Sequence, residues 1–210
     1  MTIALGIMHV PRAIPTLADT LESLTESGYS GEVYVYPDGF DHDRCPAELL
    51  RFTSGRVGLV KHYFRVLRDL LDNTKADIVM VHADDFRYLT GWADLLSRML
   101  TDEVAYVQTY VPKGLAERHG WGRGVHRFNG GWATSWGGGY AYTRAIAESM
   151  LTDPIITGYD GNRHLDHIVP EWAAKRGHVQ LFPVPSLTAH IGMTSTIGNL
   201  HTVHENLAGW

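Results

Sequence analysis

A buried strand that ends in two adjacent aspartates constrains this chain more than any other feature of its sequence. Residues 78–81 are all apolar, and the segment leads through two more residues into Asp84 and Asp85. Such a run is typical of a strand buried on both faces of a parallel sheet. Open α/β sheets bind ligands at the carboxyl ends of these strands. Two neighbouring carboxylates there favour a divalent cation, although an Asp-rich turn before the next helix would use the same residues.

Length and composition describe an ordinary globular domain. The 210 residues can bury a sizeable core, and 44% of them are hydrophobic and 20% charged. The net charge of −5 argues against a protein that coats nucleic acid with its whole surface, but allows a local basic groove. Cys45 is the only cysteine, so a reducing compartment is expected. Without a basic leader or an apolar run of membrane length, the sequence predicts a cytoplasmic protein with no membrane span.

Strand-like and helix-like segments alternate along the chain. Strands are expected at 3–8, 32–36, 78–81, 103–111 and 179–184, helices at 16–27, 56–72, 90–100 and 163–176, and a strand leading into a helix at 140–150. This alternation predicts an α/β sandwich with a mainly parallel central sheet. No repeat or linker divides the sequence, so we expect one domain over residues 1–210, with a tail at 199–210.

Residues 113–139 lack regular periodicity and contain nine glycines and three tryptophans. Long structureless segments in compact domains are usually lids or binding loops. We therefore expect residues 113–131 to order over a bound ligand. The segment is also locally basic, with one acidic residue among its charged side chains, which are Lys113, Glu117, Arg118, Arg123 and Arg127. This charge suits either an acidic acceptor or the phosphates of a donor.

A third carboxylate is expected at the edge of the sheet that holds the paired aspartates. Asp38 follows the predicted strand at 32–36, and the carboxyl ends of parallel strands meet at one edge. Three carboxylates there suit a sugar nucleotide, because its hydroxyl groups can donate hydrogen bonds to them and its accompanying cation binds oxygen ligands. The tripeptide Pro-Asp-Gly at 37–39 equally satisfies a simple β-turn.

Two later segments add aromatic, imidazole and carboxylate groups. The sequence Trp-Gly-Gly-Gly-Tyr-Ala-Tyr at 136–142 offers bare backbone and aromatic faces to a sugar ring, although a glycine-rich bulge explains it as well. His190 could complete a metal shell begun by Asp85, and hydroxyl groups around Ser195 could meet phosphate. Asp166 is a candidate general base, or a salt-bridged helix residue.

Several of these segments, taken in order, resemble glycosyltransferases of the GT-A fold. They are the opening strand, the Pro-Asp-Gly turn, the Asp-Asp strand end, the Gly-Gly-Gly-Tyr-Ala-Tyr segment and Pro-Ser-Leu-Thr-Ala-His-Ile-Gly at 185–192. The last is the most specific, and the resemblance covers most of residues 1–198. It implies a Rossmann-like α/β/α sandwich of the GT-A type, with a donor-nucleotide half at 1–110 and an acceptor half, with the metal histidine, at 111–198.

The resemblance also implies roles for individual residues. Asp85 and His190 would bind Mn²⁺ or Mg²⁺, and Asp166 would be the catalytic base. The donor-binding residues would be Asp38, Arg56, Asp84, Gly138, Gly139 and Ser195. The chain departs from the family at Ala83, where an acidic residue is common, so Asp85 would be the only carboxylate ligand.

The chemistry that these residues suit is sugar transfer. Transfer from a nucleoside diphosphate requires a cation at the leaving diphosphate and a base at the acceptor hydroxyl. The sequence therefore predicts a metal-dependent, inverting glycosyltransferase that uses a nucleoside-diphosphate sugar, with a UDP-sugar as the preferred donor. The acceptor is open between a saccharide, a lipid, a small molecule and a hydroxymethylated DNA base. A sugar nucleotidyltransferase and a non-catalytic sugar-binding module are the alternatives from other classes.

Overall fold

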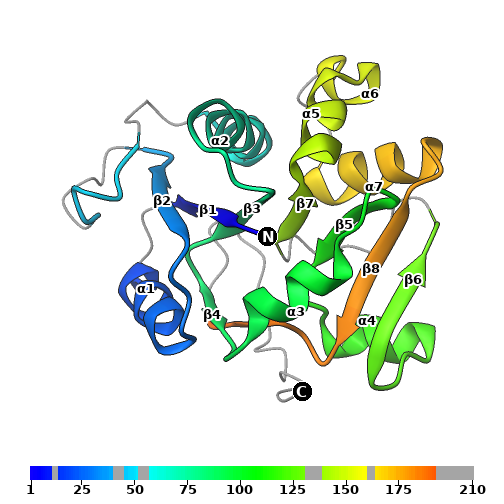
Figure 1. Cartoon of the computed structure of the whole chain (residues 1–210), viewed down its shortest axis with the longest axis horizontal. Coiled ribbons are helices and arrows are strands. Elements are labelled where there is room, and N and C mark those ends of the chain that lie inside the picture. Colours follow the sequence, from blue (N-terminus) through cyan, green and yellow to red (C-terminus); the bar gives the residue numbers. More distant parts are fainter. Residues whose placement is uncertain (11–13, 40–44, 52–56, 131–138, 160–163, 193–210) are drawn as a thin grey trace.

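The computed structural model describes residues 1–10, 14–39, 45–51, 57–130, 139–159 and 164–192. A seven-stranded sheet in the order β2-β1-β3-β7-β5-β8-β6 forms its centre, and β4 and β9 form a second sheet (Figure 1). The strands are β1 (Ile3–His9), β2 (Glu32–Pro37), β3 (Ile78–Ala83), β4 (Phe86–Tyr88), β5 (Val104–Gln108), β6 (Gly124–Phe128), β7 (Tyr140–Thr143), β8 (Val179–Val184) and β9 (Thr188–His190). The helices are α1 (Leu17–Glu26), α2 (Leu59–Asn73), α3 (Trp92–Met99), α4 (Lys113–His119), α5 (Arg144–Thr152), α6 (Pro154–Thr157) and α7 (Leu165–Lys175).

The central sheet is mainly parallel, as the sequence predicts. Strands β1, β2, β3, β5 and β8 run in one direction, whereas β6 and β7 run in the opposite direction. The carboxyl ends of β2, β1, β3 and β5 therefore lie at one edge of the sheet. The first residue of β7 lies at the same edge, because Tyr140 pairs with Val81 on one side and with Gln108 on the other.

Helices cover both faces of the sheet. Leu67 of α2, Met150 of α5 and Trp172 of α7 are fully buried in the cluster on one face. Leu24 of α1 and Leu96 of α3 belong to the cluster on the other face. Figure 1 shows α1 and α3 on the side of the sheet away from α2, α5 and α7. This arrangement explains why β3 is buried from Ile78 to His82 and reads as an unbroken apolar strand.

The prediction of an aperiodic segment at 113–139 is wrong for its first half. Residues 113–119 form α4, and residues 124–128 form β6, an edge strand that pairs with β8. Helix α4 has seven residues, too few to show helical periodicity, and β6 alternates half-buried and exposed positions among arginine and histidine side chains. The sequence pattern also does not predict the short strands β4 and β9 or the helix α6. The helix through Pro170 is confirmed as α7. No helix in the described ranges has the length and apolar character needed to cross a membrane.

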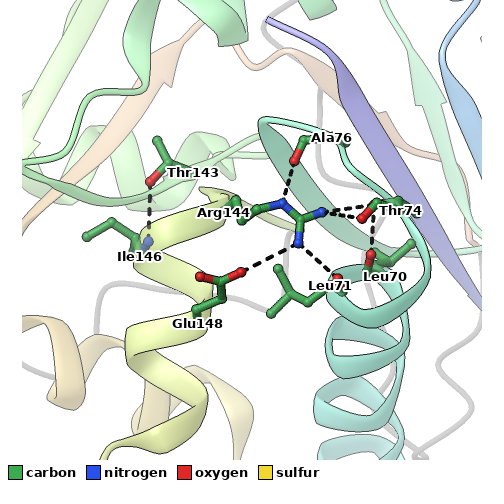
Figure 2. A network of polar contacts seen from close by, with 8 residues as sticks. All are labelled: Leu70, Leu71, Thr74, Ala76, Thr143, Arg144, Ile146 and Glu148. Carbon is green, nitrogen blue, oxygen red and sulfur yellow. Dashed lines mark hydrogen bonds and ion pairs between the residues drawn. The ribbon is translucent and has the colours of Figure 1, made fainter.

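At the opposite edge of the sheet, Arg144 closes the end of α2 (Figure 2). Its Nε donates to the Ala76 carbonyl oxygen at 2.9 Å, and its Nη1 donates to that of Leu71 at 2.9 Å. Its Nη2 donates to the carbonyl oxygen of Thr74 at 2.8 Å. One cation thus satisfies the Leu71 carbonyl group in the last turn of α2 and two carbonyl groups in the segment that follows the helix.

Candidate active site

The two candidate metal ligands are brought together by the two-stranded sheet. Strand β4 follows Asp85 directly and pairs with β9 in antiparallel register, so that Phe86 lies opposite His190. The backbone N–H of Ile191 donates to the carbonyl oxygen of Asp85 at 2.8 Å. As a result, Nε2 of His190 lies 3.2 Å from Oδ2 of Asp85, although 105 positions separate the two residues in the sequence.

Gly192 leaves space beside this pair. A Cβ atom at position 192 would lie 2.7 Å from Oδ2 of Asp85 and 3.1 Å from Nε2 of His190. The first distance is shorter than Cβ atoms tolerate, so any side chain here would push into the two ligand atoms. A glycine at this point therefore keeps room for a small ion at the carboxylate and the imidazole.

The donor set fits a divalent cation. A carboxylate oxygen suits Mn²⁺ and Mg²⁺ alike, and Mn²⁺ accepts an imidazole nitrogen beside oxygen ligands more readily than Mg²⁺ does. Within the described ranges, no group of three or more His, Cys, Asp or Glu side chains could hold a metal ion. A cation at Asp85 and His190 would therefore take its remaining ligands from a substrate such as a diphosphate and from water.

Asp84 is fully buried, and its carboxylate is held by the protein itself. Nδ1 of His9, the last residue of β1, is hydrogen-bonded to Oδ2 of Asp84. His9 is 4% exposed, and its Nε2 has no hydrogen-bond partner in the described part of the chain. His9 is not predicted from the sequence, although a polar residue that ends an apolar strand at this edge is a usable signal.

Asp38 is engaged in holding the start of α2. Its carboxylate accepts hydrogen bonds from the backbone N–H groups of Val57 at 2.6 Å and Gly58 at 3.2 Å. Its own N–H donates to the carbonyl oxygen of His9 at 2.8 Å. Asp38 thus lies at the expected edge, but β1 separates it from the aspartates that follow β3. The other predicted donor-binding residues Arg56, Gly138 and Ser195 lie outside the described residues.

Asp166 lies in the first turn of α7 and faces the start of β7. The Tyr140 hydroxyl donates to Oδ1 of Asp166 at 3.3 Å. Since Tyr140 pairs with Val81 near the carboxyl end of β3, this contact connects Asp166 to the edge that carries Asp85. The first turn of a helix also stabilises the ionised form of a carboxylate.

Gly139 has a packing reason to be glycine. Its φ is +71°, and a Cβ atom there would lie 1.7 Å from Cδ2 of His82. The fully buried imidazole of His82 is in turn hydrogen-bonded to the hydroxyl groups of Tyr88 at 2.9 Å and Thr109 at 3.1 Å. Because Tyr88 belongs to β4, His82 helps to fix the strand that follows Asp85, and Gly139 makes room for it.

Two further polar side chains at the end of β5 were not predicted. Gln108 is fully buried and Tyr110 is 4% exposed. Neither Oε1 of Gln108 nor the Tyr110 hydroxyl has a hydrogen-bond partner in the described part of the chain. Burial raises the pKa of Tyr110 to about 12, so this hydroxyl keeps its proton at neutral pH. Its ring packs near those of Phe86 and His190, at centroid distances of 5.5 Å and 6.0 Å.

Comparison with solved structures finds a similar fold in two glycosyltransferases. GalNAc-T7, solved with UDP, GalNAc and Mn²⁺, superimposes with a TM-score of 0.62 at 13% sequence identity, over 91% of this chain and 44% of the other. The mannosyltransferase PcManGT from Pyrobaculum calidifontis, solved with GDP-Man and Mn²⁺, gives 0.60 at 16% identity, over 86% and 54%. The chain therefore spans about half the length of these proteins. No family model and no curated protein matches it in sequence. The chain has the GT-A fold, which is the fold of both of these glycosyltransferases.

Proposed function

We propose that this protein is a metal-dependent glycosyltransferase that moves a sugar from a nucleoside diphosphate to an acceptor hydroxyl. The observation that carries the proposal is the contact of 3.2 Å between Asp85 and His190, beside a glycine that leaves them room. The pair lies at the sheet edge where open α/β folds bind ligands. Both structural neighbours were solved with Mn²⁺ and with a nucleotide or nucleotide sugar, which supports the same class of donor here.

In this proposal Asp85 and His190 hold a divalent cation, and Mn²⁺ is preferred because one of the two ligands is a nitrogen. When bound, the cation neutralises the charge that develops on the leaving diphosphate. The phenyl ring of Phe86 and the ring of Tyr110 pack beside His190 and limit the orientations of its imidazole. The backbone pairing of β4 with β9 fixes both ligands on rigid elements.

Asp166 acts as the general base in this proposal. The carboxylate of Asp166 lies in the first turn of α7, where it can take the proton of an acceptor hydroxyl. The hydrogen bond from Tyr140 orients the carboxylate. Direct attack of that hydroxyl on the sugar would invert the configuration at the anomeric carbon, so we propose an inverting reaction.

The order of the strands suggests how the donor lies. Asp85 follows β3. On one side of β3 lies β7, whose Tyr140 contacts Asp166. On the other side lie β1 and β2, with His9 at the end of β1 and Asp38 just after β2. A donor whose diphosphate is at Asp85 and His190 would place its nucleoside toward β1 and β2. Its sugar would then lie toward β7 and β5, where Asp166 can receive the acceptor.

Calorimetry of UDP and GDP binding tests this function. We expect binding in the presence of Mn²⁺ that is lost when a chelator is added, and we expect the Asp85→Asn variant to lose it as well. The matched control is Asp94→Asn, which changes a carboxylate in the first turn of α3. Equal affinity for the nucleotides with and without Mn²⁺ would contradict the proposal. Metal-dependent binding combined with formation of nucleotide sugars from a nucleoside triphosphate and a sugar phosphate would instead indicate a nucleotidyltransferase.

Three exposed arginine side chains bear on the chemical class of the acceptor. The side chains of Arg118, Arg123 and Arg127 are exposed, and none makes an ion pair or a hydrogen bond with another described residue. We therefore propose a phosphate-bearing acceptor, of which a hydroxymethylated base in DNA is one case. Binding of such a duplex should weaken steeply with salt, and Arg123→Ala with Arg127→Ala should flatten that dependence. Absence of DNA binding at low salt would direct the search to saccharide, lipid or small-molecule acceptors.

A further inference from the structure

Gln108 and Tyr110 each have a buried polar atom without a hydrogen-bond partner among the described residues. Most buried polar atoms in proteins have a hydrogen-bond partner, and a buried group without one costs roughly 1–3 kcal/mol. Oε1 of Gln108 and the hydroxyl of Tyr110 have none in the described part of the chain. Gln108 is the last residue of β5 and Tyr110 lies two positions further along the chain, so both side chains belong to the carboxyl end of this strand.

This region lies between the candidate metal ligands and the candidate base. The Tyr110 ring is 6.0 Å from the ring of His190, measured between centroids. Gln108 pairs with Tyr140 across the sheet, and the Tyr140 hydroxyl contacts Asp166. The two groups thus connect the metal side of the site with the side that would receive the acceptor.

The contacts that these residues do make determine what the free atoms can do. Nε2 of Gln108 donates to the carbonyl oxygen of Tyr110 at 2.8 Å, which leaves Oε1 as an acceptor. The Tyr110 hydroxyl can both donate and accept a hydrogen bond. One acceptor and one hydroxyl that can donate or accept match neighbouring hydroxyl groups of a sugar ring, each of which both donates and accepts.

We propose that Gln108 and Tyr110 form the subsite that binds the hydroxyl groups of the transferred sugar. The proposal rests on the glycosyltransferase function argued above and adds residues that select the sugar. In it, a sugar hydroxyl donates to Oε1 of Gln108, and the Tyr110 hydroxyl bonds to a neighbouring oxygen of the same ring. A donor that lacks these hydroxyls would leave both buried atoms without partners, so the subsite discriminates among sugars.

The test compares each nucleoside diphosphate with its sugar conjugates. Calorimetry with Mn²⁺ gives the affinities of UDP, UDP-glucose, UDP-GalNAc, GDP and GDP-mannose for the wild type and for Tyr110→Phe. The variant keeps the aromatic ring and removes only the hydroxyl. We expect it to bind the preferred nucleotide sugar about threefold to tenfold more weakly, the usual effect of one uncharged hydrogen bond. Its affinity for UDP and GDP should stay at the wild-type value.

Tyr106→Phe provides the matched control on the same strand. The Tyr106 hydroxyl donates to Oε1 of Gln180 at 2.5 Å, so it already has a partner within the protein. Its loss should lower the melting temperature without changing the difference in affinity between nucleotide and nucleotide sugar. Gln108→Met, which keeps the length of the side chain, gives a second variant that should weaken nucleotide-sugar binding selectively.

The outcomes separate this inference from the function on which it rests. If the wild type binds neither UDP nor GDP in a metal-dependent manner, the proposed function is wrong and the sugar subsite is wrong with it. If it binds them, but Tyr110→Phe and Gln108→Met bind the nucleotide sugars as tightly as the wild type, only the subsite is wrong. An equal loss for nucleotide and nucleotide sugar would also overturn the subsite, because it would place both residues at the nucleotide.

Discussion

The two ends of β3 both carry aspartates, and their surroundings differ in kind. Asp77, just before the strand, is exposed and accepts hydrogen bonds from the backbone N–H of Thr2 at 2.7 Å and from its hydroxyl at 3.1 Å. Asp84 and Asp85, just after the strand, are 0% and 6% exposed. One end is therefore in contact with water and with Thr2, the residue before β1, and the other is enclosed by β1, β4 and β9.

The hydrogen bonds of Arg144 lie near the end of β3 that carries Asp77, and their partners are all groups of the protein itself. The backbone N–H of Arg144 donates to the Asp77 carbonyl oxygen at 2.8 Å, and its guanidinium group reaches the end of α2. At the other end, by contrast, Gly192 leaves space beside Asp85, and His9, Gln108 and Tyr110 have buried polar atoms without described partners. The difference leads to the division that we propose, in which the first end contributes stability and the second binds a ligand. Four substitutions test that division.

The largest effect is expected at Asp166. Asp166→Asn should lower the turnover of the donor and acceptor by roughly two to four orders of magnitude, the usual consequence of losing a general base. Donor affinity and the free energy of unfolding should change little. Steady-state kinetics with calorimetry separates the two effects, and a variant that loses donor binding but keeps turnover would move Asp166 to the donor site.

Gly192→Ala should come next. Its Cβ atom would lie 2.7 Å from Oδ2 of Asp85, so we expect metal-dependent binding of UDP or GDP to weaken about 10-fold to 100-fold, a range typical of disturbed metal ligands. Gly114→Ala is the control, since a Cβ atom at position 114 in α4 would have no heavy atom within 4 Å. Wild-type nucleotide binding by Gly192→Ala would show that the space beside Asp85 has no function.

Arg144→Met should act on stability alone. Removing the guanidinium group leaves carbonyl oxygens at the end of α2 without donors, so the free energy of unfolding should fall by about 2–3 kcal/mol in chemical denaturation. Nucleotide affinity should be unchanged. Glu148→Ala is the control: it removes only a 3.5 Å contact from a half-exposed carboxylate and should change stability by less than about 0.5 kcal/mol. A loss of nucleotide binding in Arg144→Met would contradict the division between an end of β3 that stabilises the protein and an end that binds a ligand.

The smallest effect is expected at Asp77. Hydrogen bonds from the backbone and side chain of Thr2 hold the pKa of this carboxyl below its usual value. A carboxyl whose pKa is lower in the folded state stabilises the protein above its unfolded pKa, near 3.9, and this stabilisation is lost as pH falls through the folded value. The denaturation midpoint of Asp77→Asn should therefore lie slightly below that of the wild type at neutral pH and converge with it near pH 2. A constant difference over that range would show that the Asp77 carboxylate does not contribute through its charge.

Much of the fold follows from local patterns. The unbroken apolar run of β3 reflects burial on both faces, and the alternation of strands and helices reflects the sandwich that provides such burial. The position of Asp84 and Asp85 at a strand end is equally local. These features are readable because each depends on residues that are adjacent in the sequence.

The immediate surroundings of the site required the tertiary structure. The Asp85–His190 contact depends on two three-residue strands that are too short to show a period and that pair across about half of the chain. The pairing of His9 with Asp84, the position of Gln108 beside Tyr140 and the strand β6 depend on register in the same way. The sequence alone determined which side chains with suitable chemistry lie at strand ends. Only the tertiary structure decided which of them meet, because hydrogen bonds between distant strands, and not local propensity, set their register.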